Sequence, residues 1–173
     1  QIVTPDANEE WHYTFNAPKY DADGKEISYT VEEAPLLSFI PSYEGYNIEN
    51  TYLAPVLVDP PILQKMVKGD DGAPGTQFKF LLKGSDGAPM PEGSEGNTKL
   101  LTMEGGGEME IGEITFDRVG IFVYTVTELN GGMKGWTYDT AAYTFTVTVT
   151  EEDGKLISHT NFTRNGVPKH PLI

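Results

Sequence analysis

Threonine alternates with large apolar residues in residues 143–150, whose sequence is YTFTVTVT. Because successive side chains of a β-strand point to opposite faces, this pattern predicts a strand with Tyr143, Phe145, Val147 and Val149 toward a core and threonines toward solvent. The chain also holds 19 Gly and 12 Pro, and no window of it shows convincing helical periodicity. We therefore expect an all-β protein.

Short alternating runs separated by turn residues recur through the last two thirds of the chain. The predicted strands are residues 62–68, 77–83, 99–103, 112–116, 120–128, 143–150 and 156–161. About seven such strands are typical of an antiparallel β-sandwich with Greek-key connections. Residues 84–112 are rich in Gly and Glu, so we expect part of this segment to be a mobile excursion.

The first third of the chain contains a second group of predicted strands. They are residues 11–15, 26–33 and 46–52. Residues 21–24, with the sequence DADG, predict a hairpin turn between the first two, and the aromatic residues of 11–15 are expected to face a core. Three prolines in residues 53–61 predict a stiff linker that leads into a strand. We place a domain boundary near Ala54, which divides the chain into two tandem β-sandwich modules, residues 1–54 and 55–173.

The composition excludes several classes of function. The net charge of −14 argues against nucleic acid and anionic membranes as partners. The absence of cysteine excludes disulfides and thiolate chemistry, and no apolar run is long enough to span a bilayer. The three histidines share no metal-ligand spacing, and no hydrolase motif is present, so we expect no metal, no cofactor and no conventional enzyme activity.

Glutamate ends two apolar stripes in the predicted strands. Glu128 shares a strand face with Tyr124 and Val126, and Glu33 follows Tyr29 and Val31 in the same way. A buried carboxylate is costly unless it is protonated or paired, so its repetition in the same setting suggests a chemical role.

Lysine and asparagine also occur on apolar faces. Lys65 shares a face with Leu63 and Val67, and Asn50 lies between two apolar neighbours on its own face. A desolvated lysine amine is nucleophilic, and a protonated glutamate can polarise an asparagine carboxamide. Attack of the amine on the amide would release ammonia and leave an isopeptide bond.

Ordinary structural roles are the alternatives for these residues. From strand alternation alone, Glu128 could turn to solvent at the end of its strand, and Lys65 could extend its amine past apolar neighbours to water. Asn50 alone would be typical of a turn or cap.

The order and spacing of short motifs resemble two known families. Residues 11–52 resemble the C-terminal half of a Cna B-type domain, and residues 58–173 resemble a streptococcal-type pilin isopeptide-linkage domain. The first resemblance is carried by WHYTF at 11–15, PKY at 18–20, GK at 24–25, YTV at 29–31, Glu33, and NIENTY at 47–52. The second is carried by PI at 61–62, Lys65, Gly69, FKFL at 78–81, ITF at 114–116, Gly120, YTVTE at 124–128, YD at 138–139, Tyr143, and VTV at 147–149.

The resemblance implies β-sandwich modules of Gram-positive surface proteins and pili, many of which form a self-catalysed Lys–Asn bond between their first and last strands. It implies that Lys65 is the nucleophile and Glu128 the acid of the second module. In the first module it implies that Glu33 is the acid and Asn50 the acceptor.

Both modules depart from the family pattern. The first lacks the opening strands that should carry the lysine for Asn50, and the second ends before the strand expected to bring an asparagine to Lys65. Asn161 and Asn165 lie one strand too early or in the turn after it, so we do not expect either to be the partner. The missing strands would then be absent, disordered, or supplied by another chain.

We expect a structural stalk or backbone module of an extracellular, cell wall-attached adhesin or pilus, with other domains or subunits of the same protein as partners. Its only reaction would be a single-turnover cross-link of itself. The alternative is an adhesin module that binds a host protein or glycan, which an exposed aromatic patch around Trp136 would favour. A third hypothesis is an accessory domain of a secreted enzyme.

Overall fold

The computed structural model describes residues 11–69 and 75–168, and it contains only β-strands and their connections in these residues. The strands are β1 (Phe39–Glu44), β2 (Asn47–Tyr52), β3 (Val56–Val58), β4 (Leu63–Lys65), β5 (Gln77–Gly84), β6 (Thr98–Glu104), β7 (Gly107–Met109), β8 (Ile114–Phe116), β9 (Gly120–Leu129), β10 (Ala142–Glu152), β11 (Lys155–Arg164) and β12 (Val167–Pro168). The all-β fold class is therefore confirmed.

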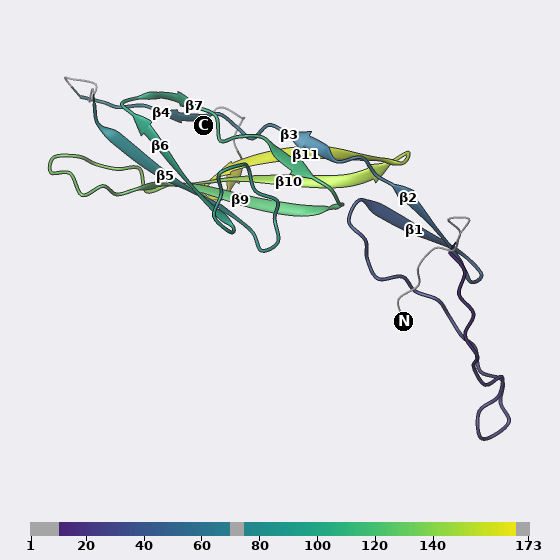
Figure 1. Ribbon diagram of the computed structural model, residues 1–173. Helices are drawn as coiled ribbons and strands as arrows, with labels where there is room; N and C mark the ends of the chain where they lie inside the picture. Colours follow the sequence, from purple (N-terminus) through teal and green to yellow (C-terminus); the bar gives the residue numbers. More distant parts are fainter. Residues whose placement is uncertain (1–10, 70–74, 169–173) are drawn as a thin grey trace.

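A six-stranded antiparallel sheet forms one layer of the molecule, in the order β12-β11-β10-β9-β5-β6. Two small sheets, β3 with β8 and β4 with β7, lie along one face of it (Figure 1). Apolar residues of both layers form one buried core, which makes this unit a β-sandwich.

Aromatic rings fill the centre of this core. Tyr124 of β9 is fully buried and stacks on Phe145 of β10, with 4.7 Å between ring centroids. Phe116 of β8 meets the Tyr124 ring edge-on from the second layer, with 6.4 Å between centroids. The Tyr124 hydroxyl donates a hydrogen bond to the Pro89 carbonyl oxygen at 2.6 Å. The alternation expected for residues 143–150 is present at Phe145, Val147 and Val149, which are all buried, whereas Tyr143 is only half-buried.

The strands predicted at residues 11–15 and 26–33 were wrong. Among the described residues, this region contains only an isolated bridge between Tyr20 and Glu26. The bridge closes the predicted turn, in which the Asp21 carboxylate accepts backbone hydrogen bonds at 2.9–3.0 Å and Gly24 adopts a positive φ. Trp11 is 66% exposed and does not face a core. An alternating sequence becomes a strand only when a neighbour supplies backbone hydrogen bonds, and no neighbouring strand is present for these residues in the described part of the chain.

Four strands were not predicted from the sequence, namely β1, β3, β7 and the two-residue β12. β1 carries Pro41 and pairs with β2, β3 lies in the predicted linker, and β7 lies in the predicted mobile excursion. β3 and β7 have three residues each, which is too short for an alternation to be recognised.

The β1–β2 hairpin lies at one end of the sandwich (Figure 1). Two backbone hydrogen bonds hold its base, from Ser38 to the Asp117 carbonyl at 3.1 Å and from Leu53 to the Ser38 carbonyl at 2.8 Å. Leu53 itself is 2% exposed and belongs to the sandwich core. The hairpin is therefore joined to the sandwich both along the chain and through contacts.

Candidate functional site

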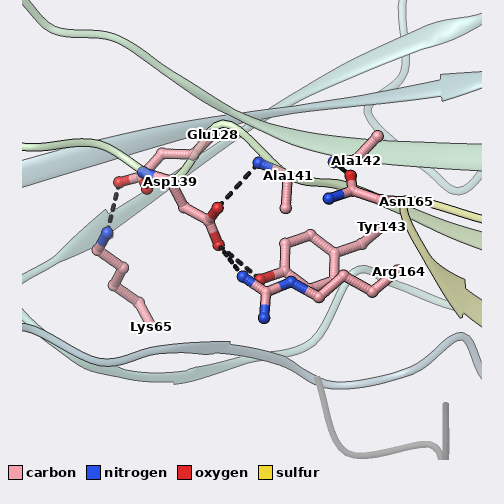
Figure 2. A network of polar contacts seen from close by, with 8 residues as sticks. All are labelled: Lys65, Glu128, Asp139, Ala141, Ala142, Tyr143, Arg164 and Asn165. Atoms are coloured by element: carbon pink, nitrogen blue, oxygen red, sulfur yellow. Dashed lines mark hydrogen bonds and ion pairs between the residues drawn. The ribbon is translucent and has the colours of Figure 1, made fainter. Parts of the chain in front are cut away.

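A lysine and a glutamate meet inside the sandwich. Lys65 ends β4 and Glu128 lies near the end of β9, and the Nζ atom of the lysine is 2.6 Å from Oε1 of the glutamate (Figure 2). The side chains are 13% and 3% exposed. Both point inward because they follow the buried residues Leu63 and Val126 at the strand period of two. The structure thus brings together the two residues that the sequence analysis assigned to the second module.

An aromatic ring covers the lysine amine. The Nζ atom of Lys65 lies 4.6 Å from the centroid of the Phe78 ring, which is itself buried. Trp136 and Tyr138 meet this ring edge-on, at 5.5 and 6.5 Å between centroids. The amine therefore has an apolar ring and the carboxylate of Glu128 as its immediate neighbours. Trp136 is half-buried in this packing, so it does not supply the exposed aromatic patch that would favour the adhesin alternative.

The second oxygen of Glu128 has a different partner. The backbone N–H of Asp139 donates to Oε2 at 2.8 Å. The Asp139 carboxylate in turn accepts hydrogen bonds from the Ala141 N–H at 2.8 Å and the Tyr143 hydroxyl at 2.6 Å, and it pairs with Arg164 at 3.3 Å (Figure 2). None of these residues was predicted to belong to the site. Tyr143 was expected to face the core, and it contributed to the family resemblance together with the Tyr-Asp pair at 138–139.

Two groups beside the site have shifted pKa values. Burial and the hydrogen bond to Asp139 raise the pKa of Tyr143 to about 12. Burial alone would raise the pKa of Asp139, but the hydrogen bonds from Tyr143 and Ala141 and the charges of Arg164 and Lys65 together hold it below its usual value. Tyr143 is therefore a hydrogen-bond donor and Asp139 a charged acceptor at neutral pH.

A groove of about 420 Å³ opens beside the lysine and the glutamate. Its apolar lining includes Leu63, Phe80 and Phe162, contributed by β4, β5 and β11. Lys65, Glu128, Asp139, Tyr143 and Arg164 supply the polar part of the same lining. A groove of this composition can accept an extended polypeptide segment with one polar side chain directed at Lys65.

The other predicted acid and acceptor also meet. Asn50 of β2 donates from Nδ2 to Oε1 of Glu33 at 3.1 Å, and the Glu33 N–H donates to the Tyr43 hydroxyl at 3.2 Å. Asn50 is exposed and Glu33 is half-buried, so this pair is far more open to water than the Lys65–Glu128 pair.

The two late asparagines have other environments. Asn161 lies opposite Thr146 on the exposed face of β11. Asn165 lies in the turn between β11 and β12, where its Oδ1 accepts a hydrogen bond from the Ala142 N–H at 2.9 Å. Within residues 11–69 and 75–168, neither asparagine has a hydrogen bond to Lys65 or Glu128.

Among residues 11–69 and 75–168, no group of three or more His, Asp or Glu residues could hold a metal ion. No helix there is long and apolar enough to cross a membrane.

Two family models match the chain. One, described as Spy0128-like isopeptide containing domain, matches residues 61–169, and the other, described as Cna protein B-type domain, matches residues 1–51. Both resemblances drawn from the sequence motifs are confirmed, including the partial N-terminal one. No curated protein matches the chain.

Proposed function

Because the chain belongs to the family of Spy0128-like isopeptide containing domains, a family of structural domains in pilins and surface proteins, we propose that Lys65 forms an isopeptide bond promoted by Glu128. The module would then be a load-bearing part of a pilus or a surface stalk, attached to the cell wall and in contact with other domains or subunits of the same protein. Its chemistry would be one cross-link per molecule rather than turnover of a substrate.

The observation that carries this proposal is the buried contact of 2.6 Å between Lys65 Nζ and Glu128 Oε1. Transfer of one proton along this contact converts an ion pair into a neutral amine and a carboxylic acid without changing the net charge of the site. A poorly hydrated environment favours the neutral forms. Proton transfer therefore prepares the nucleophile and the acid in one step.

The bond-forming step uses the carboxamide of an asparagine. The protonated Glu128 donates a hydrogen bond to the amide oxygen, which makes the amide carbon more electrophilic. Lys65 Nζ then forms a bond to that carbon, and the bond from the carbon to the amide nitrogen breaks. A proton from the amine passes through Glu128 to the leaving nitrogen, so the products are an isopeptide and ammonia.

The groove beside Lys65 supports a strand as the carrier of this asparagine. β12 pairs with β11 next to Thr163 and Arg164, which line the groove. This edge of the sheet is therefore where we expect an additional strand to bring its amide toward Lys65. The strand would come from this protein or from another copy of it.

A second site is proposed in the first module, with Glu33 as the acid and Asn50 as the acceptor. Their contact of 3.1 Å supports this pairing. The lysine would come from opening strands of the Cna B-type domain that residues 11–52 do not include. The family matches end at residue 51 and begin at residue 61, which supports a division of the chain near Ala54.

Peptide mapping of the protein from the cells that make it tests the proposal. A peptide containing Lys65 should be joined to an asparagine-containing peptide, with a mass one ammonia below their sum. Glu128→Gln should abolish this species, because an amide cannot relay the proton, whereas Glu110→Gln, at an exposed position, should leave it unchanged. Recovery of Lys65 as an unmodified residue in the wild-type protein would refute the proposal.

A further inference from the structure

The two oxygens of Glu128 have chemically different partners. Oε1 faces the amine of Lys65, and Oε2 accepts a hydrogen bond from the backbone N–H of Asp139. A backbone N–H can only donate, so Oε2 must be an acceptor in both protonation states of the glutamate. A proton held by Glu128 is therefore directed to Oε1, the oxygen beside the nucleophile.

The position of this N–H depends on the side chain of Asp139. Residues 130–141 form a connection without regular strand structure between β9 and β10, and this connection includes Gly131, Gly132 and Gly135. At its end, the Asp139 carboxylate is held by its own turn through Ala141. It is also held by Tyr143 at the start of β10. Two residues of this region thus fix a backbone group that would otherwise end a glycine-rich segment.

The third holding residue comes from another strand. Arg164 lies near the end of β11, and its guanidinium is 3.3 Å from Asp139 Oδ2. Arg164, Tyr143 and Asp139 all line the groove beside Lys65. A segment that enters the groove would exclude water from these contacts and strengthen them. The residues that hold Glu128 in place therefore also form part of the groove wall, against which the acceptor segment would lie.

We propose that Asp139, held by Tyr143 and Arg164, is a positioning residue that directs the proton of Glu128 to Oε1. This proposal rests on the proposed function, because it assigns a role within the same cross-linking site. Asp139 does not touch the reacting atoms through its carboxylate, and it acts through the hydrogen bond of its backbone to Oε2.

Two tyrosines provide a matched pair of variants. Tyr143→Phe removes the 2.6 Å hydrogen bond to Asp139 and retains the ring. Tyr138→Phe makes the same chemical change at the residue before Asp139, but the Tyr138 hydroxyl is buried and has no hydrogen-bond partner among the described residues. Only the first variant should disturb the Asp139 backbone.

The first measurement is the NMR scalar coupling across the hydrogen bond between the Asp139 amide nitrogen and the Glu128 carboxyl carbon, in the full chain. We expect the coupling in the wild type and in Tyr138→Phe, and its loss or clear weakening in Tyr143→Phe. If Tyr143 served only to stabilise the fold, its replacement would not weaken this particular coupling. An unchanged coupling in Tyr143→Phe would overturn the proposal.

The second measurement is the rate of cross-linking, followed by mass spectrometry after a pulse of isotope-labelled amino acids in the cells that make the protein. Tyr143→Phe should slow the reaction about 10- to 100-fold, because small displacements of reacting groups have effects of this size. Tyr138→Phe should react at the wild-type rate. Equal rates for both variants would refute the positioning role alone, whereas unreacted Lys65 in the wild type would refute the proposed function itself.

Discussion

Replacement of Lys65 by methionine would show how strongly the buried ion pair depends on both of its members. Methionine retains most of the length and the apolar stem of lysine, so the packing against Phe78 is largely kept. The carboxylate of Glu128 remains, with a side chain that is 3% exposed, and it loses the ammonium group 2.6 Å away. One hydrogen bond from the Asp139 N–H is then its remaining partner in the described structure.

The distance sets the size of the expected effect. At 2.6 Å and an effective dielectric constant of about 20, the attraction of two unit charges is about 6 kcal/mol. Desolvation of both groups offsets most of this attraction in the intact pair, but a single remaining charge keeps the penalty without the compensation. We therefore expect Lys65→Met to lower the free energy of unfolding by about 3–5 kcal/mol.

The partner variants should be milder. Glu128→Gln leaves a lysine whose side chain is 13% exposed and lies against the Phe78 ring, so a cost of about 1–3 kcal/mol is expected. The double variant contains no buried charge at this position. It should be more stable than Lys65→Met alone. The sum of the losses in unfolding free energy of the two single variants should exceed the loss in the double variant by about 2–3 kcal/mol.

Urea unfolding, monitored by tryptophan fluorescence, measures these differences. The comparison uses protein whose intact mass shows that Lys65 is unreacted, so that loss of a cross-link does not enter the result. A double variant as unstable as the sum of the single variants would refute the reasoning. So would a Lys65→Met protein with wild-type stability, because the pair would then be solvated rather than buried.

Three further predictions concern the packing and the pH dependence of the sandwich. A Cβ atom added at Gly106 would lie 3.0 Å from the Lys65 carbonyl oxygen, so Gly106→Ala should displace β4, lower the free energy of unfolding in urea by about 1–3 kcal/mol and slow cross-linking. Tyr124→Phe leaves the half-buried Pro89 carbonyl without its 2.6 Å hydrogen bond and should cost about 1–3 kcal/mol in the same assay. The folded state lowers the pKa of Asp139. The charged Asp139 carboxylate therefore stabilises the folded state above the ordinary aspartate pKa of about 3.9, and this stabilisation is lost as the pH falls through the lowered pKa. Asp139→Asn should consequently flatten the acid side of a plot of melting temperature against pH.

The long strands of the sandwich could be predicted from the sequence because each has one face in the core. β5, β9, β10 and β11 have eight to eleven residues, and their alternation is long enough to recognise. Lys65 and Glu128 were found for the same reason, since a charged residue in an apolar stripe is conspicuous only once the stripe has been identified. Their mutual contact followed from the family resemblance, not from the alternation.

The remaining features depend on contacts that leave little trace in the sequence. Residues 27, 29, 31 and 33 are half-buried and their neighbours are exposed, as the alternation predicted, yet they form no strand because no strand pairs with them in the described structure. The support of Glu128 by Asp139 uses a backbone N–H, which every residue except proline possesses. No residue pattern could have identified that contact.

The separation of Lys65 and Glu128 along the chain, 63 residues, has a consequence for the timing of the proposed reaction. Glu128 lies opposite Phe80 in the interior of the large sheet, so its position is defined only after β5 and β9 have paired. β4 must then pack over that sheet before the amine meets its acid. In a molecule that has not folded to this stage, Lys65 has no contact with Glu128 and the proton cannot be transferred. The cross-link would therefore form only in molecules that have folded. The fraction of molecules that have lost ammonia would then equal the fraction that reached the native state.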